Sequence, residues 1–515
     1  MADGGGDNHP ASGDHIFDDD CPPGHTAYSY RAGSSEARIP AGHTAFSYGQ
    51  PSAADRAIAA KMNKFGAACF DSGKRELLPK AEAMYRGALR RWPGFAFARF
   101  NLATLLCCPR TQTQTDRAAR LREALAHLRV AVAARPSFKE AHANAAALLL
   151  KLCPAADGDG DGNAARLEEA RLACLAALRV DPGYADAHWN LASVLRRLGR
   201  KEAAVARTWR CLLAAAAAEG KDTAAARRCA REAGVQVGGS DSAASESDSG
   251  ADGEEAGGDE TPRPPNGLTD ERPLAVVCVK WGAKYNAGYV NKLARAVRRH
   301  LSAPHEFFCF TDNADGVGVK VGADPEEYVR VRPLPDNGWG TWWTKPAALF
   351  GPGLAAALGG GPAGRRVLYI DLDTVIVGSL DDLAAYRGPF ALLSTTGLAN
   401  EGFDGGYNSS VMAFGAGWGR ARVWRPLAAL GLPLVRRFVH RFDHWLEMCA
   451  PRADVLQDLL PGQLVEYARD CRGRKDGPPA GARVVNFPLE PKPHAPECRA
   501  LGWVVKHWGH FEQPR

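Results

Sequence analysis

Residues 366–380 read RVLYIDLDTVIVGSL, an apolar run that two carboxylates, Asp371 and Asp373, interrupt. The residues before them predict a buried strand over 367–370, where an uncompensated charge is costly. Alternate side chains of an extended chain share one side, so both Asp are expected to face the same way and Leu372 the other. Their oxygens suit one hard divalent ion with open positions for phosphate. The alternative is that the two Asp only end a strand and begin a turn.

Length and composition limit the class of protein. A chain of 515 residues is too long for one hydrophobic core and predicts two or three domains. The net charge of +6 comes without a dense basic cluster among aromatics, so no nucleic-acid partner is expected. The 13 Cys form no CxxC pair, which favours reduced thiols and a cytoplasmic location. Without a signal-like start or a run of about 18 apolar residues, no membrane span is expected.

Composition divides the chain into four segments. We expect a disordered segment over 1–52, a helical repeat domain over 53–235, an acidic disordered linker over 236–272 and an α/β domain over 273–515. The linker holds eight acidic residues and no Lys or Arg between Asp241 and Glu260.

Two short motifs receive no assigned function. GHTAYSY at 24–30 returns as GHTAFSY at 42–48, and a docking peptide used twice and a duplication without consequence both remain open. DGDGDG at 157–162, followed by Glu168, fits a calcium loop. Pro154 stands where the incoming helix should run, however, so we interpret the motif as a low-complexity insertion.

A similar phrase occurs three times in the helical segment. It reads PGFAFARFNLA at 93–103, PSFKEAHANAA at 136–146 and PGYADAHWNLA at 182–192. These phrases resemble tetratricopeptide repeats, in which Pro ends one helix pair and an aromatic residue opens the next helix. Their spacing exceeds the usual period of about 34 residues, so the loops must carry insertions. Such a domain implies a concave face that binds a protein partner; a helical brace that only packs on the next domain is the alternative.

The last segment alternates between strand and helix periods. Strands are expected over 274–279, 307–310, 328–331 and 367–370, and helices over 289–301 and 345–358. This order predicts an α/β sheet that binds its ligand at the carboxyl ends of the strands.

Six ordered phrases of this segment resemble a known fold. VCVKWGAKY, FFCFTDN, WWTKPAALF, RVLYIDLDTVIVGSLDDL, GYNSSVMAF and EPKPH are similar to the Rossmann-like glycosyltransferase A fold. That group contains glycogenin-like and bacterial lipopolysaccharide glycosyltransferases. The resemblance covers about 272–510 and implies a hexosyltransferase that uses a nucleotide-diphosphate sugar, expected to be a UDP-sugar, and an unknown glycan or protein acceptor.

The resemblance also implies site residues. Asp371 and Asp373, as a DxD motif, would bind Mn²⁺ or Mg²⁺, which neutralises the diphosphate leaving group. The implied donor-binding residues, besides Asp371, are Lys280, Tyr285 and Asp312 toward the nucleoside and Lys345 near the donor. Asn408, which would face the sugar, is implied as a catalytic residue together with Asp443.

The chain departs from the family pattern in two places. Pro488 stands where many relatives place a metal-binding His, so the third ligand must be Glu490, His494 or water. We expect His494, with Lys492 on the pyrophosphate. The family's acidic phrase near the acceptor is also altered, and Asp443 is the expected carboxylate on that side.

Three functions follow as hypotheses. The first is a cytoplasmic, manganese- or magnesium-dependent glycosyltransferase whose repeats recruit the acceptor or a protein partner. The second is a repeat scaffold with a degenerate transferase domain, which the missing His favours and the two retained Asp oppose. A sugar-nucleotide pyrophosphorylase is disfavoured because no Gly-rich phosphate loop follows the first strand.

Overall fold

The computed structural model describes the chain in several stretches. They are residues 51–108, 117–153, 160–237, 272–318, 328–335, 338–339, 343–360, 365–396, 398, 405–488 and 490–509. The predictions for 1–50, for most of the Asp-Gly insertion and for nearly all of the acidic linker lie outside these residues. The chain forms two compact units, Met1–Leu198 and Gly199–Arg515. Within the described residues, no helix has both the length and the apolar content that a membrane crossing requires.

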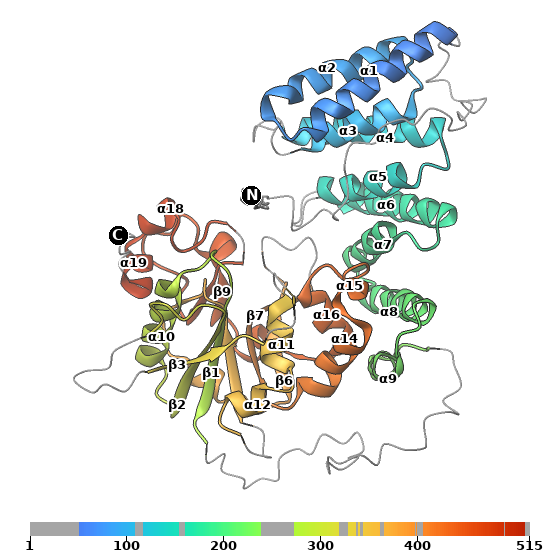
Figure 1. The fold of residues 1–515 in the computed structure, drawn as a ribbon. Coiled ribbons are helices and arrows are strands. Elements are labelled where there is room, and N and C mark those ends of the chain that lie inside the picture. The colour runs from blue at the N-terminus through green and yellow to red at the C-terminus, as the bar shows by residue number, and fades with distance from the viewer. Residues whose placement is uncertain are drawn as a thin grey trace, which may run out of the picture. The chain divides into compact units, whose positions relative to one another are not determined.

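The first unit consists of helices that pack in successive pairs (Figure 1). The helices are α1 (Ala53–Asp71), α2 (Leu78–Arg91), α3 (Ala96–Cys107), α4 (Arg117–Ala134), α5 (Lys139–Leu152), α6 (Gly160–Val180) and α7 (Ala185–Arg197). Each repeated phrase opens α3, α5 or α7, as the sequence predicts. Asn190, in the third phrase, donates to the carbonyl of Ala143, in the second, at 2.9 Å. A contact between two of the phrases therefore joins neighbouring helix pairs.

The second unit is built on a seven-stranded sheet in the order β3-β2-β1-β4-β7-β6-β8 (Figure 1). Strands β1 to β4 run parallel to one another, whereas β7 runs antiparallel to β4 and β6. The strands are β1 (Leu274–Lys280), β2 (His305–Thr311), β3 (Val329–Pro333), β4 (Arg366–Ile370), β6 (Phe390–Ser394), β7 (Tyr407–Gly415) and β8 (Asp454–Val455). A second sheet, in the order β5-β10-β9, contains β5 (Val375–Ile376), β9 (Leu464–Glu466) and β10 (Val484–Asn486).

Helices cover both faces of the large sheet because its strands are apolar on both sides. In β4, Val367 and Tyr369 belong to one buried cluster, and Leu368 and Ile370 belong to the other. The first cluster includes residues of α8 (Lys201–Ala218), α9 (Ala224–Glu232), α11 (Thr344–Phe350), α12 (Leu354–Ala357), α14 (Arg425–Leu430), α15 (Leu432–Val435) and α16 (Phe442–Cys449). The second includes residues of α10 (Ala287–His300), α13 (Asp381–Ala384), α17 (Leu456–Leu459), α18 (Pro496–Arg499) and α19 (Gly502–Trp508).

Two local predictions are wrong. The helix expected over 345–358 is divided into α11 and α12, because Gly351, Pro352 and Gly353 cannot sustain a regular helix. The chain is also not extended through Asp373. Strand β4 ends at Ile370, and a turn follows in which the amide of Thr374 donates to the carbonyl of Asp371 at 3.3 Å.

Helices α8 and α9 lie before the acidic segment but pack in the second unit. The indole of Trp209 in α8 is fully buried, lies 5.4 Å from that of Trp445 and donates to the carbonyl of Met448 at 3.2 Å. Glu219 pairs with Arg437 at 2.6 Å. The division between compact units therefore falls at 198/199, whereas composition places the end of the repeat domain at 235.

This packing predicts that Trp209→Ala destabilises the second unit. Loss of a fully buried indole and its cavity should lower the free energy of unfolding by about 3–5 kcal/mol. Chemical denaturation of the full chain, with the indole fluorescence of Trp445 and its neighbours as the probe, measures the change. Arg210→Ala, at an exposed position of the same helix, is the control. An unfolding transition of the α/β unit that is unchanged in Trp209→Ala would contradict the packing.

Candidate functional site

The carboxyl ends of three parallel strands bring the predicted donor residues to one edge of the sheet. Strand β1 pairs with β2 on one side and with β4 on the other, so Lys280, Thr311 and the chain after Ile370 end side by side. The chain order reverses between β1 and β4, and ligands of open α/β sheets bind at such a switch point.

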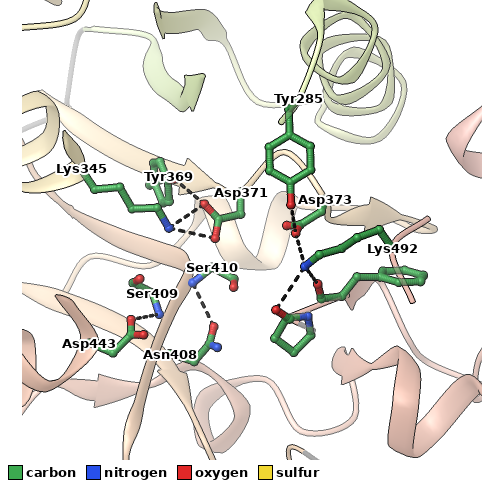
Figure 2. Close-up of polar contacts among 12 residues, drawn as sticks. Tyr285, Lys345, Tyr369, Asp371, Asp373, Asn408, Ser409, Ser410, Asp443 and Lys492 are labelled. Carbon is green, nitrogen blue, oxygen red and sulfur yellow. Dashed lines mark hydrogen bonds and ion pairs between the residues drawn. The ribbon is translucent and has the colours of Figure 1, made fainter. Parts of the chain in front are cut away.

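Asp371 is held by a lysine and a tyrosine. Lys345, on α11, places its ammonium 2.8 Å from Oδ1 and 2.9 Å from Oδ2, and the hydroxyl of Tyr369 also donates to Oδ1 (Figure 2). The amide of Asp371 donates to the carbonyl of Ser410 on β7 at 2.8 Å. Burial raises the pKa of Asp371; the positive charge of Lys345 opposes the shift, and the negative charge of Asp373 adds to it.

Asp373 has a separate lysine. Oδ2 accepts from the ammonium of Lys492 at 2.7 Å and from the hydroxyl of Tyr285 at 2.8 Å (Figure 2). Lys492 also donates to the carbonyls of Phe487 at 2.7 Å and Pro488 at 3.1 Å, which fixes its buried ammonium. Burial and then the charge of Asp373 raise the pKa of Tyr285, so its hydroxyl stays protonated and donates.

Strand β7 and helix α16 supply the other side of the site. The amide of Ser409 donates to Oδ1 of Asp443 at 2.9 Å, and the side-chain oxygen of Asn408 accepts from the amide of Ser410 at 3.0 Å (Figure 2). Glu447, one turn after Asp443 and fully buried, accepts from the amide of Tyr407 at 3.1 Å. Sequence reasoning missed Glu447, although its spacing of four residues from Asp443 places both on one helix face.

The remaining predicted residues lie in three environments. Lys280 is buried and donates to the carbonyl of Asn313 at 3.2 Å. Asp312 is exposed and accepts from the amide of Gly282 at 2.7 Å, where a φ of 60° requires the freedom of glycine. His494 is exposed, and its Nδ1 contacts the hydroxyl of Tyr289.

The side chains of the site supply only part of the ligands that a hard cation requires. Two carboxylates are the usual protein contribution to Mg²⁺ sites that substrate phosphates complete. In the stretches that the structure describes, however, no group of three or more His, Cys, Asp and Glu side chains is arranged to hold a metal. His494 is thus not brought together with the two Asp, and its role as third ligand stays a prediction.

Comparisons with known proteins give weak likenesses. No protein-family model matches the chain, and no curated protein matches it. Among solved structures, a thermophilic TPR protein of Thermus thermophilus is 21% identical, with 30% of this chain and 73% of that one covered and a TM-score of 0.24. The MamA protein is 18% identical over 30% and 71% of the two chains, with a TM-score of 0.23. A mutant O-GlcNAc transferase of Thermobaculum terrenum is 17% identical over 51% and 38%, with a TM-score of 0.23. Such scores carry no argument about function.

The two ion pairs lead to a test of the site's electrostatics. Lys345→Met should lower the free energy of unfolding by about 3 kcal/mol, because it leaves the carboxylate of Asp371 without its cation. Lys345→Met combined with Asp371→Asn should recover most of that loss, since no uncompensated charge remains. Chemical denaturation of the four members of this double-mutant cycle measures the coupling. Additive losses would show that the two side chains do not stabilise each other.

Proposed function

We propose that the second unit is a metal-dependent glycosyltransferase of the A-fold group that transfers a sugar from a nucleotide-diphosphate donor, a UDP-sugar in the first instance. The observation that carries the proposal is the pair of carboxylates directly after β4, at the switch point, each beside a buried lysine. Carboxylates and ammoniums in one place suit a cation and the diphosphate that it accompanies. A turn that is only structural needs neither the carboxylates nor the lysines.

The residues fit distinct tasks. Asp371 and Asp373 would hold Mn²⁺ or Mg²⁺, which when bound offsets the charge of the departing diphosphate. Lys492 is anchored by two main-chain carbonyls and can donate to a phosphate oxygen without losing its position. Asn408 has its side-chain oxygen bound to the amide of Ser410, which directs the amide nitrogen toward a sugar hydroxyl. Asp443, fixed by the amide of Ser409, is the carboxylate proposed for the acceptor hydroxyl.

The helical repeats fit recruitment of an acceptor or of a protein partner. Their helix pairs form an extended stack, and such stacks expose long binding surfaces. The proposed enzyme would thus combine a recruiting unit with a transferring unit. The proposal specifies the acceptor only as a glycan or a protein.

A scaffold with a degenerate transferase unit is the second candidate. Among the described residues, the two Asp are joined by no third metal-binding side chain, and each already has a lysine partner. On this reading, the lysines replace the cation and the site only maintains the fold.

Donor binding separates the two candidates. The full chain is mixed with UDP-, GDP- and CMP-sugars, with and without Mn²⁺, and its melting temperature is measured. A ligand that binds the native state raises this temperature by mass action. The enzyme predicts a rise for one nucleotide class that requires Mn²⁺, and slow hydrolysis of that sugar. No shift with any donor would support the scaffold.

Asp373→Asn is the matched variant for the proposed reaction. The amide keeps the shape of the side chain but removes the charge that would hold the cation, so turnover should fall by about two orders of magnitude or more. Circular dichroism should show an intact fold. Turnover that is unaffected by this change or by EDTA would remove the metal from the mechanism.

His494 and Glu490 are the two side chains to compare as the third metal ligand. Both side chains are exposed near Lys492, and Glu490 accepts from the amide of Lys492 at 3.1 Å. If His494 completes the site, His494→Ala should raise the Mn²⁺ concentration for half-maximal turnover by about tenfold or more, in line with the loss of other metal-site groups. Glu490→Gln should change it less. Equal Mn²⁺ dependence in wild type and His494→Ala would exclude this residue.

A further inference from the structure

The first residue of α8 contacts the entry to strand β7. Lys201 donates from its ammonium to the carbonyl of Gly405 at 2.8 Å, and the same nitrogen lies 4.1 Å from the centre of the Tyr407 ring. A charged donor forms a stronger hydrogen bond than a neutral one, and an ammonium is attracted to the face of an aromatic ring. Asn408, the residue proposed to face the sugar, follows Tyr407 directly.

The ladder between β6 and β7 is irregular beside Asn408. Leu392 of β6 pairs with Met412, but the next residue, Leu393, pairs with Asn408, so three residues of β7 have no partner in the β6 register. Beyond this irregularity, Asn408 and Tyr407 pair with Leu393 and Ser394, so a short ladder of two residue pairs holds this end of β7. Side chains that contact the same end add to this short ladder.

Several side chains hold the residues before Asn408 from other directions. Gly405 and Gly406 donate their amides to the hydroxyls of Thr396 at 2.9 Å and Thr395 at 2.8 Å. Tyr407 donates its amide to Glu447. Among these contacts, Lys201 provides the formal positive charge, and it comes from the chain before the acidic segment, 204 residues away from Gly405.

We propose that Lys201 is a positioning residue of the active site, which holds the start of β7 so that Asn408 faces the donor sugar. The catalytic part of this inference rests on the proposed function; the structural part does not. Helix α8 also packs through Trp209 against α16, the helix of Asp443. A helix that the sequence assigns to the repeats thus completes the acceptor side of the site.

The test compares three variants of the full chain. Lys201→Met removes the ammonium and keeps an apolar stem, and Lys201→Arg keeps a cation that can bind both a carbonyl and a ring. Glu219→Gln, at the other end of α8, breaks the contact with Arg437 and is the matched control. Amide hydrogen exchange of residues 405–410 and hydrolysis of the sugar nucleotide found by melting temperature are measured.

Lys201→Met should raise the exchange rate of residues 405–410 by about tenfold, the loss expected for one charged hydrogen bond. It should lower kcat by at least about tenfold and leave KM near the wild-type value, because the donor is bound by other residues. Lys201→Arg should restore both, and Glu219→Gln should change neither.

Two results would overturn the inference. Unchanged exchange in Lys201→Met would show that Lys201 does not hold the strand, whatever the activity. A raised amide exchange rate with unchanged kcat would show that the contact of Lys201 is purely structural. A wild type that hydrolyses no sugar nucleotide would refute the proposed function instead, and exchange alone would then decide whether Lys201 holds β7.

Discussion

Two buried lysines beside two carboxylates hold the candidate site together. Lys345 joins helix α11 to Asp371 at the end of β4, and Lys492 joins the segment after β10 to Asp373. Each lysine has less than a tenth of its surface exposed, and removing one member of such an ion pair leaves the charge of the other uncompensated, which is costly. The turn after β4 is therefore held by two other segments of the chain, α11 and the residues after β10.

Under the proposed function, the same charges favour joint entry of a donor and a cation. In the structure, two ammoniums balance two carboxylates. A divalent ion alone would add positive charge to this neutral site, and a diphosphate alone would add negative charge, whereas the two together nearly cancel. Charge in a site of low dielectric is costly, so joint binding is favoured over separate binding. Lys345 and Lys492 could then exchange a carboxylate oxygen for a phosphate oxygen and remain paired.

The sequence predicts what depends on local period and misses what depends on long-range contact. Strand β4 follows from an uninterrupted apolar run, helix α10 follows from apolar residues three to four positions apart, and the structure confirms both. The division between α11 and α12 has a local cause in the Gly-Pro-Gly at 351–353, although the helical spacing on either side hides it. Glu447 was missed although it lies four residues after Asp443, because that spacing does not show that a strand amide lies against its carboxylate.

Helix α8 shows why the domain boundary was hard to read. By sequence it follows the third repeated phrase and has the same helical period as the other helices, so no local feature separates it from them. What separates it is its partners: Trp209 packs with Trp445, and Lys201 contacts Gly405, both far along the chain. Along the chain, Leu198, Gly199 and Arg200 lie between α7 and α8, so the helical period resumes after three residues and marks no boundary there.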